Sequence, residues 1–335
     1  MMDWRWRLSE IKQDKPVKVF STFSCGGGST MGYKKAGFRV LGNVELDPAI
    51  NAMYVKNHHP QYNYCMDLRD FNRIEELPED LYKLDILDGS PPCSTFSFVG
   101  KREKSWGIEK KFREGQKRQT LDDLFFVFLD TVAKLKPKIV IAENVAGLVM
   151  GNAKGYVREI LAEFRELGYD VQLFKLNSAW MDVPQKRERV FFIANRMGYP
   201  AIKLDFNHTP IKFGQVRTTQ GKDINPDSML AKRLKLVKPG DGRMMDMMVR
   251  MYGKANNYST LLVPDNKTCR TVTSGGVYVR TADQKMFSDK DFINVQTFPQ
   301  DYDFCGNSVQ YVCGMSVPPN MMANIAMEVW RQWLA

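Results

Sequence analysis

Residues 17–46 read VKVFSTFSCGGGSTMGYKKAGFRVLGNVEL, and this stretch decides the fold class. Its two apolar runs, at 17–23 and 38–46, have the length and composition of buried β-strands. Three glycines follow the first strand and allow a tight turn, and Glu45 ends the second strand. Ligands of open parallel sheets bind beyond the carboxyl ends of the strands, so we expect a binding site at this edge.

Further apolar runs continue this pattern along the chain, at 84–90, 138–145, 170–177 and 189–196. Between them, apolar side chains recur at helical spacing in residues 47–58, 120–137 and 154–169. Alternating strands and helices predict an α/β fold with a doubly wound, mostly parallel sheet.

The alternation weakens after Ala194, and residues 198–269 are rich in Met, Asn, Gly and Lys. We therefore expect two domains. Residues 1–197 together with 300–335 would form the larger one, and residues 198–299 would form a small irregular domain with a hinge segment.

The net charge of +10 favours a polyanionic partner. Residues 101–118 carry eight Lys or Arg against three Glu, and residues 198–269 carry twelve basic against six acidic side chains. A solvated surface is the alternative for either segment taken by itself, because most charge runs are only exposed faces.

Cysteine usage and hydropathy exclude several protein classes. The six cysteines form no CxxC pair and the chain has three histidines, so we expect neither a disulfide framework nor a metal site. The first residues lack the apolar core of a signal peptide, and no segment approaches the roughly 18 apolar residues of a membrane helix. We expect a protein of the cell interior without a membrane partner.

Polar side chains follow further strands at the same predicted edge. A further strand end, before the run 84–90, offers Asp67 in CMDLRD (65–70). Cys93 of GSPPCSTFS (89–97) follows the run 84–90, and Glu143 lies near the end of the run 138–145. Taken singly, such a cysteine is usually a buried inert thiol, and such a glutamate is usually a helix cap. Neighbouring strand ends nevertheless place both groups on the edge that carries the glycine turn.

Two arginines extend this set. Arg187 and Arg189 alternate in QKRER, so they would face one side of a strand. The glycine turn with Glu45 is common to nicotinamide, flavin and S-adenosylmethionine sites, and a plain tight turn is its alternative. A thiol, a carboxylic acid and two guanidiniums beside a nucleotide-type cofactor form a far more specific constellation.

These motifs resemble those of the C5-cytosine-specific DNA methyltransferases of the bacterial and phage modification type. The resemblance covers nearly the whole chain and rests, in order, on FSCGGGSTMGYKKAGF, GSPPCSTFS, ENV, QKRERVFFIA and GMSVPPNMMANIA. It implies an S-adenosylmethionine-dependent methyltransferase fold, with a small target-recognition domain inserted between QKRER and the closing motif. The irregular segment 198–269 matches that insertion.

The resemblance also implies a mechanism. Cys93, as a thiolate held by two prolines, would attack C6 of a cytosine flipped out of double-stranded DNA. Glu143 would hydrogen-bond or protonate N3, and Arg187 and Arg189 would hold the base and stabilise charge. Methyl transfer to C5, loss of the C5 proton and elimination of Cys93 complete the cycle, and no metal is required.

The implied site residues fall into two further groups. For the cofactor S-adenosylmethionine they are Phe23, Gly27, Gly28, Glu45, Asp67, Pro91 and Ser316. For DNA they are Ser94, Lys101, Arg102 and Lys104, in a basic loop that would contact phosphates.

This chain departs from the family pattern at three places. Cys25 stands where the family usually has glycine, and Met315 stands where it usually has asparagine after Gly314. The segment DKDFINVQTFP matches the usual Arg-Glu segment only in part.

Two alternatives to a DNA cytosine methyltransferase remain open from the sequence. One is a relative that methylates tRNA cytosine, and the other is an inactive DNA-binding relative. We expect a monomer in the cytoplasm of a bacterial or phage-infected cell, associated with the nucleoid, whose target sequence cannot be read from the chain.

Overall fold

The computed structural model describes residues 2–92, 123–150, 154–253 and 260–335. The chain divides into two compact units. The sheet unit comprises Ser9–Asn177, Glu188–Asp205 and Met322–Ala335, and the second unit comprises Met1–Leu8, Ser178–Arg187 and Phe206–Met321. The second unit thus includes residues 206–299 of the expected recognition domain together with segments outside it. The limits of that functional domain stay a prediction.

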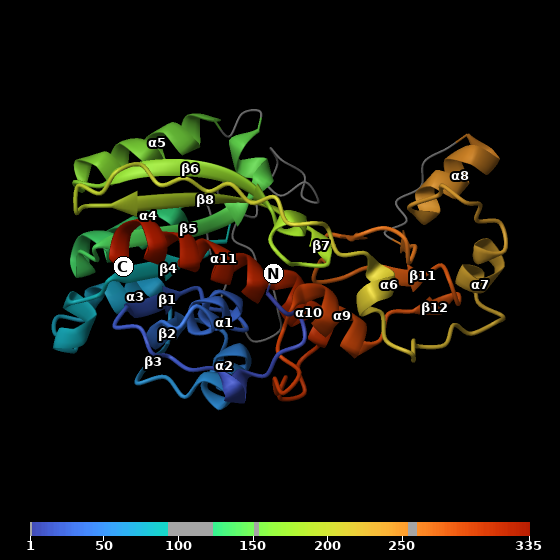
Figure 1. Cartoon of the computed structure of the whole chain (residues 1–335), viewed down its shortest axis with the longest axis horizontal. Coiled ribbons are helices and arrows are strands. Elements are labelled where there is room, and N and C mark those ends of the chain that lie inside the picture. Colours follow the sequence, from blue (N-terminus) through green and yellow to red (C-terminus); the bar gives the residue numbers. More distant parts are fainter. Residues whose placement is uncertain (1, 93–122, 151–153, 254–259) are drawn as a thin grey trace. The chain divides into compact units, whose positions relative to one another are not determined.

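The sheet unit is built on seven strands in the order β3-β2-β1-β4-β5-β8-β6 (Figure 1). Their bounds are β1 Lys18–Thr22, β2 Arg39–Glu45, β3 Tyr62–Cys65, β4 Ile86–Gly89, β5 Ile139–Val145, β6 Asp170–Asn177 and β8 Glu188–Asn195. The first five strands in the sheet order are parallel, and β8 is antiparallel to both β5 and β6. The predicted α/β fold with a mostly parallel sheet is confirmed.

Helices cover both faces of this sheet. They are α1 Gly28–Lys35, α2 Pro48–His58, α3 Leu68–Arg73, α4 Leu124–Leu135 and α5 Lys154–Glu166, with α11 Pro319–Val329 near the C-terminus. Phe20 of β1 and Leu87 of β4 belong to the core formed with α3, α4 and α5. Because side chains alternate along a strand, Ser21 and Asp88 point to the opposite face, where Tyr33 of α1 contacts Asp88.

The direction of sheet growth reverses beside β1. After β1 the chain adds β2 and β3 on one side, and it then crosses to add β4 and β5 on the other. The register aligns the strand ends, because Thr22 pairs with both Val44 and Gly89, and Gly89 pairs with Ala142. The loops after β1 and β4 therefore leave the same edge next to each other, at the point where open sheets bind ligands.

The second unit contains a three-stranded sheet, β12-β11-β9, and a two-stranded sheet, β10-β7. Its strands are β7 Gln185–Lys186, β9 Thr260–Val263, β10 Cys269–Arg270, β11 Val277–Arg280 and β12 Lys285–Met286. Its helices are α6 Phe213–Val216, α7 Met229–Leu234, α8 Met244–Tyr252, α9 Asp289–Gln296 and α10 Val309–Met315. The irregular segment is thus more regular than expected, since α8 buries Met244, Met247 and Met248 at helical spacing.

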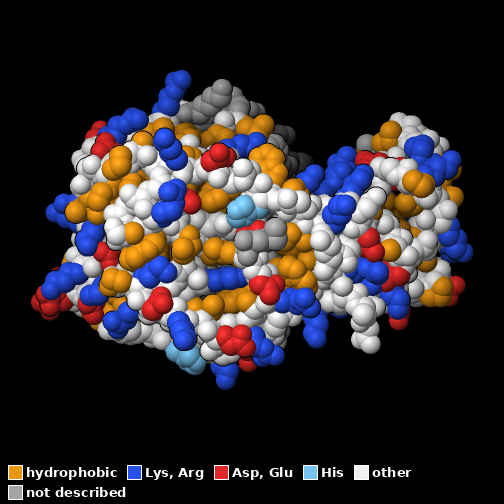
Figure 2. Space-filling model, in the orientation of Figure 1, with side chains coloured by type: hydrophobic (Ala, Val, Ile, Leu, Met, Phe, Trp, Pro, Cys, Tyr) orange, Lys and Arg blue, Asp and Glu red, His pale blue; other side chains and the backbone are white. Residues whose placement is uncertain are grey.

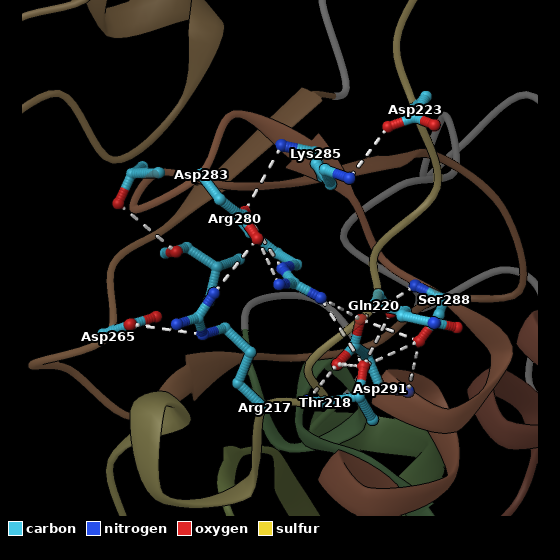
Figure 3. Close-up of polar contacts among 12 residues, drawn as sticks. Arg217, Thr218, Gln220, Asp223, Asp265, Arg280, Asp283, Lys285, Ser288 and Asp291 are labelled. Atoms are coloured by element: carbon cyan, nitrogen blue, oxygen red, sulfur yellow. Dashed lines mark hydrogen bonds and ion pairs between the residues drawn. The ribbon is translucent and has the colours of Figure 1, made fainter.

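A buried arginine, Arg280, lies at the centre of a polar network in the second unit (Figure 3). Arg280 at the end of β11 is fully buried and donates to the carboxylates of Asp283 and Asp291, the latter at 3.4 Å. Asp291 also accepts hydrogen bonds from Ser288, the N-cap of α9, in a capping box. This network joins β11 to the start of α9, the segment that only partly matched the family pattern.

No helix in the described ranges is long and apolar enough to cross a membrane.

Replacing Arg280 by alanine should lower the free energy of unfolding by about 3 kcal/mol, because it leaves the buried Asp291 carboxylate without its cationic partner. Thermal and denaturant unfolding would measure the loss. Lys222→Ala is the matched control, since it breaks the exposed ion pair with Asp289 and should cost under ~1 kcal/mol. Equal effects of the two substitutions would contradict a special role for the buried pair.

Candidate active site

The turn after β1 adopts left-handed backbone at three residues, Phe23, Cys25 and Gly27, with φ of 52°, 45° and 73°. Gly27 is the N-cap of α1, which begins at Gly28. Left-handed backbone suits glycine and costs another residue roughly 1–2 kcal/mol. Cys25 therefore has the left-handed backbone conformation expected of the glycine that the resemblance implies at this position, and it carries that cost.

The imidazole of His58, at the end of α2, packs against the glycine turn. A Cβ atom on Gly27 would lie 2.2 Å from His58 Nε2, so only glycine fits between the turn and this ring. Lys34 Nζ donates to the carbonyl oxygen of His58 at 3.0 Å. Burial, reinforced by the Lys34 charge, lowers the pKa of His58 well below its usual value, so the ring is neutral at pH 7.

Two carboxylates lie at the ends of β2 and β3. Glu45 accepts hydrogen bonds from the backbone N–H of Cys25 at 2.8 Å and of Asp47 at 2.9 Å, and burial raises the pKa of Glu45. Asp67 caps α3 by accepting from the Arg69 N–H. A carboxylate oxygen can accept more than one hydrogen bond, and both side chains are only partly buried. These two hydrogen-bond acceptors therefore fit the ribose hydroxyls and the adenine of a nucleoside-type cofactor.

Glu143 and Arg189 form an ion pair across β5 and β8, with Arg189 Nε 2.8 Å from Glu143 Oε1. Both side chains are almost buried, 11% and 14% exposed. Burial lowers the pKa of the Arg189 guanidinium, and the charge of Glu143 opposes that shift. The sequence suggested separate roles for these residues and missed their contact, which pre-orients the glutamate.

The segment before the predicted nucleophile is anchored to the end of β5. Asn144 Nδ2 donates to the carbonyl oxygen of Pro91 at 3.1 Å. Glu143 thus lies next in the chain to the residue that fixes the start of the Cys93 segment. Cys93 itself lies outside the described residues, as do the expected DNA contacts Ser94, Lys101, Arg102 and Lys104.

Arg187 and Ser316 belong to the second unit. Arg187 is buried and donates to the backbone carbonyls of Val272 and Gly314, both at 2.9 Å. It lies between β7 and β8, directly before the strand that contains Arg189, and the expectation that both arginines face one side stays a prediction. The buried Ser316 accepts a hydrogen bond from Gln296 through its carbonyl oxygen.

Sequence reasoning missed a buried carboxylate directly before the GSPPC loop. Asp88 of β4 is 1% exposed and accepts hydrogen bonds from Ser21 Oγ at 2.7 Å and from the Tyr33 hydroxyl at 3.0 Å. Burial raises the pKa of Asp88 to about 7, against the effect of these two hydroxyls, and Glu143 adds to the rise. The available signal was an acidic residue inside the apolar run LDILDGS.

Among the described residues, no group of three or more His, Cys, Asp or Glu side chains is arranged to hold a metal ion.

The sequence of this chain is similar to those of known DNA methyltransferases. A family model described as C-5 cytosine-specific DNA methylase matches residues 17–331. The Type II methyltransferase M.Sau96I of Staphylococcus aureus is 29% identical, over 94% of this chain and 76% of that protein. The Type II methyltransferase M.AplI of Arthrospira platensis is 27% identical, over 97% of this chain and 90% of that protein.

Solved structures agree on the fold. A variant of Spodoptera frugiperda DNMT2 superposes with a TM-score of 0.62 at 16% identity, covering 94% of this chain and 99% of that one. The S. pombe Dnmt2 methyltransferase gives a TM-score of 0.60 at 13% identity, covering 94% and 98%. At these identities the likeness shows a shared methyltransferase fold.

Gly27→Ala should destabilise the protein by at least ~2 kcal/mol more than Gly168→Ala, because overpacking adds to backbone strain. Both glycines have positive φ, but an added Cβ would meet His58 at Gly27 and nothing within 4 Å at Gly168. Thermal unfolding of the two variants isolates the steric contribution. Equal destabilisation would show that His58 yields to the new methyl group.

Asp88→Asn should stabilise the protein at pH 8 and have little effect at pH 4. The pKa of Asp88 is raised to about 7 in the folded state and is ~3.9 in the unfolded chain, so the folded state binds the proton more tightly. Between these values the unfolded chain loses the proton first, and wild-type stability falls as pH rises, by a few kcal/mol in all. Unfolding midpoints of both proteins from pH 4 to 8 measure this difference.

Asp70→Asn, at an exposed position of α3, is the control and should shift stability by under ~0.5 kcal/mol at each pH. A difference between Asp88→Asn and wild type that does not depend on pH would contradict the titration of Asp88 in this range.

Proposed function

The chain belongs to the C-5 cytosine-specific DNA methylase family, and from that membership we propose that it transfers a methyl group from S-adenosylmethionine to C5 of a flipped-out cytosine in a specific double-stranded DNA sequence. The observation that carries this proposal is the Glu143–Arg189 pair at the end of β5. Register places it beside β4, whose following loop contains Cys93.

Each group of the chain would have a defined task. The Cys93 thiolate would attack C6 of the cytosine, and Glu143 would hydrogen-bond or protonate N3 as charge develops there. Arg189, already paired with Glu143, would keep that carboxyl oriented and contact the base. Once C5 carries the methyl group, loss of the C5 proton to a base such as water would allow Cys93 to leave by elimination. Arg187, bonded to two backbone carbonyls, would act by holding its loop.

The cofactor would lie at the edge formed by the ends of β1 to β4. When bound, S-adenosylmethionine supplies an electrophilic methyl group on a sulfonium sulfur. Phe23, Gly27 and Gly28 would let the backbone approach it closely. Glu45 would accept from the ribose hydroxyls, and Asp67 would lie near the adenine. Pro91 and Ser316 complete the proposed set.

Residues 198–299 would read the target sequence, with Lys, Arg, Asn and Gln side chains contacting base edges and phosphates. Exposed lysines such as Lys232, Lys235 and Lys238 supply positive charge there. Figure 2 shows basic side chains spread among acidic ones over the visible face of each unit. Ser94, Lys101, Arg102 and Lys104 would add phosphate contacts, so DNA affinity should fall with salt.

The curated relatives favour DNA as substrate, since those that match most of their own length are named Type II methyltransferases. Methylation of tRNA and loss of turnover are the competing functions. A monomer in the cytoplasm, associated with the nucleoid, is the proposed state.

Incubation with labelled S-adenosylmethionine should transfer label to duplex DNA and not to tRNA. Bisulfite sequencing of DNA from expressing cells would give the target sequence, and a duplex with 5-fluorocytosine at that target should trap the protein covalently. Fluorine at C5 cannot leave as a proton, so elimination is blocked. Label on tRNA alone would establish the first competing function, and label on neither the second.

Cys93→Ser should abolish both labelling and trapping, because a serine hydroxyl is a far weaker nucleophile than a thiolate. Glu143→Gln should slow transfer by 10²–10⁴-fold while DNA binding persists. Cys65→Ser, at an exposed cysteine, is the control and should retain full activity. A trapped adduct on Cys25 or Cys65 would overturn the assignment of the nucleophile.

A further inference from the structure

Asp88 is a buried carboxyl group whose side-chain oxygens accept hydrogen bonds, among the described residues, from two hydroxyl groups. Ser21 of β1 and Tyr33 of α1 each donate to one carboxylate oxygen. Within the part of the chain that the structure describes, no ion pair includes Asp88. Burying a carboxylate in this way is costly, and replacing it by a neutral group would usually stabilise a fold.

In the described ranges, the other charged and titratable groups around Asp88 do not neutralise its charge. Tyr33 is neutral, because burial and the neighbouring Asp88 charge raise the pKa of its phenol far above 10. Tyr54 of α2 is also buried and neutral, and it shares a hydrogen bond with Thr30. On β5, the carboxyl group of Glu143 is already paired with Arg189. The buried Lys34 of α1 donates to the carbonyl of His58 instead.

The position of this charge connects it to the proposed cofactor site. Ser21 lies two residues before Phe23, and Tyr33 lies in the helix that begins at Gly28. Asp88 itself lies three residues before Pro91 and pairs with Ser21 in the parallel register. The carboxylate is thus bonded to both elements that carry the glycine turn and is in the strand that leads to the cysteine loop.

We propose that the Asp88 carboxylate is the negative charge that raises the affinity of this protein for the sulfonium form of its cofactor relative to the neutral thioether product. S-adenosylmethionine carries a positive sulfonium, and S-adenosylhomocysteine has an uncharged sulfur at the same place. A buried charge acts through a medium of low polarisability, so it distinguishes the two ligands without touching either. The inference rests on the proposed function, because it assumes that this cofactor binds at the β1–β4 edge.

Calorimetric titration at pH 8 tests this preference. Relative to wild type, Asp88→Asn should reduce the preference for S-adenosylmethionine over S-adenosylhomocysteine roughly five- to tenfold, mainly by weakening binding of the sulfonium. Tyr33→Phe is the matched control, since it removes one hydrogen bond but leaves the charge, and its preference should stay within twofold of wild type. An unchanged preference in Asp88→Asn, or an equal loss in Tyr33→Phe, would overturn the inference.

A second measurement covers the case in which Asp88→Asn does not fold. The wild-type protein is titrated with 5′-methylthioadenosine and with its S-methyl sulfonium, a pair without titratable groups in this range. Preference for the sulfonium should fall at least threefold between pH 8 and pH 6, as Asp88 takes up a proton, and a constant preference would contradict the inference. Wild-type protein that binds neither S-adenosylmethionine nor S-adenosylhomocysteine would instead refute the proposed function itself.

Discussion

The parallel register of β1, β2, β4 and β5 is the constraint on which the site depends. Because Thr22, Val44, Gly89 and Ala142 lie side by side, the carboxyl ends of their four strands lie at one edge of the sheet. The glycine turn, the carboxylate of Glu45, residues 89–92 and Glu143 are therefore neighbours although about 120 residues of sequence separate the first from the last. A slip of one residue in any pair would turn these side chains to the other face.

Three buried charged side chains of this protein differ in the partners that compensate their charge. Arg280 is matched by two carboxylates in the second unit, and Glu143 is matched by Arg189 in the sheet unit. Among the residues that the structure describes, the Asp88 side chain accepts hydrogen bonds from hydroxyl groups alone. The first two arrangements fix side-chain positions, because each guanidinium satisfies a carboxylate geometrically as well as electrically. In the third arrangement, the negative electrostatic field of the Asp88 carboxylate is available to attract a cationic ligand.

Much of the sheet unit could be predicted because its strands are short, apolar and separated by helical periodicity, as in 138–145 followed by 154–169. The strand-end rule then located Glu45, Asp67 and Glu143. Helix α8 was missed because its buried face consists of methionines, which gave little contrast in a methionine-rich segment. The pairings Glu143–Arg189 and Tyr33–Asp88 join residues about 50 positions apart, and their geometry depends on register that composition does not contain.

The position of Asp88 suggests why a fold would retain an uncompensated carboxylate. Stability alone favours a neutral residue in the middle of a buried strand, and β4 has Ile86 on the same face. Positions where a chain has a residue that lowers stability in this way are commonly functional positions. In a methyl transfer from a sulfonium, the ligand loses one positive charge in each turnover, so substrate and product differ more in charge than in shape. The Asp88 carboxylate, hydrogen-bonded to β1 and α1, would discriminate between substrate and product by this difference in charge. Hydrogen bonds to the ribose and adenine cannot do so, because both ligands contain these groups.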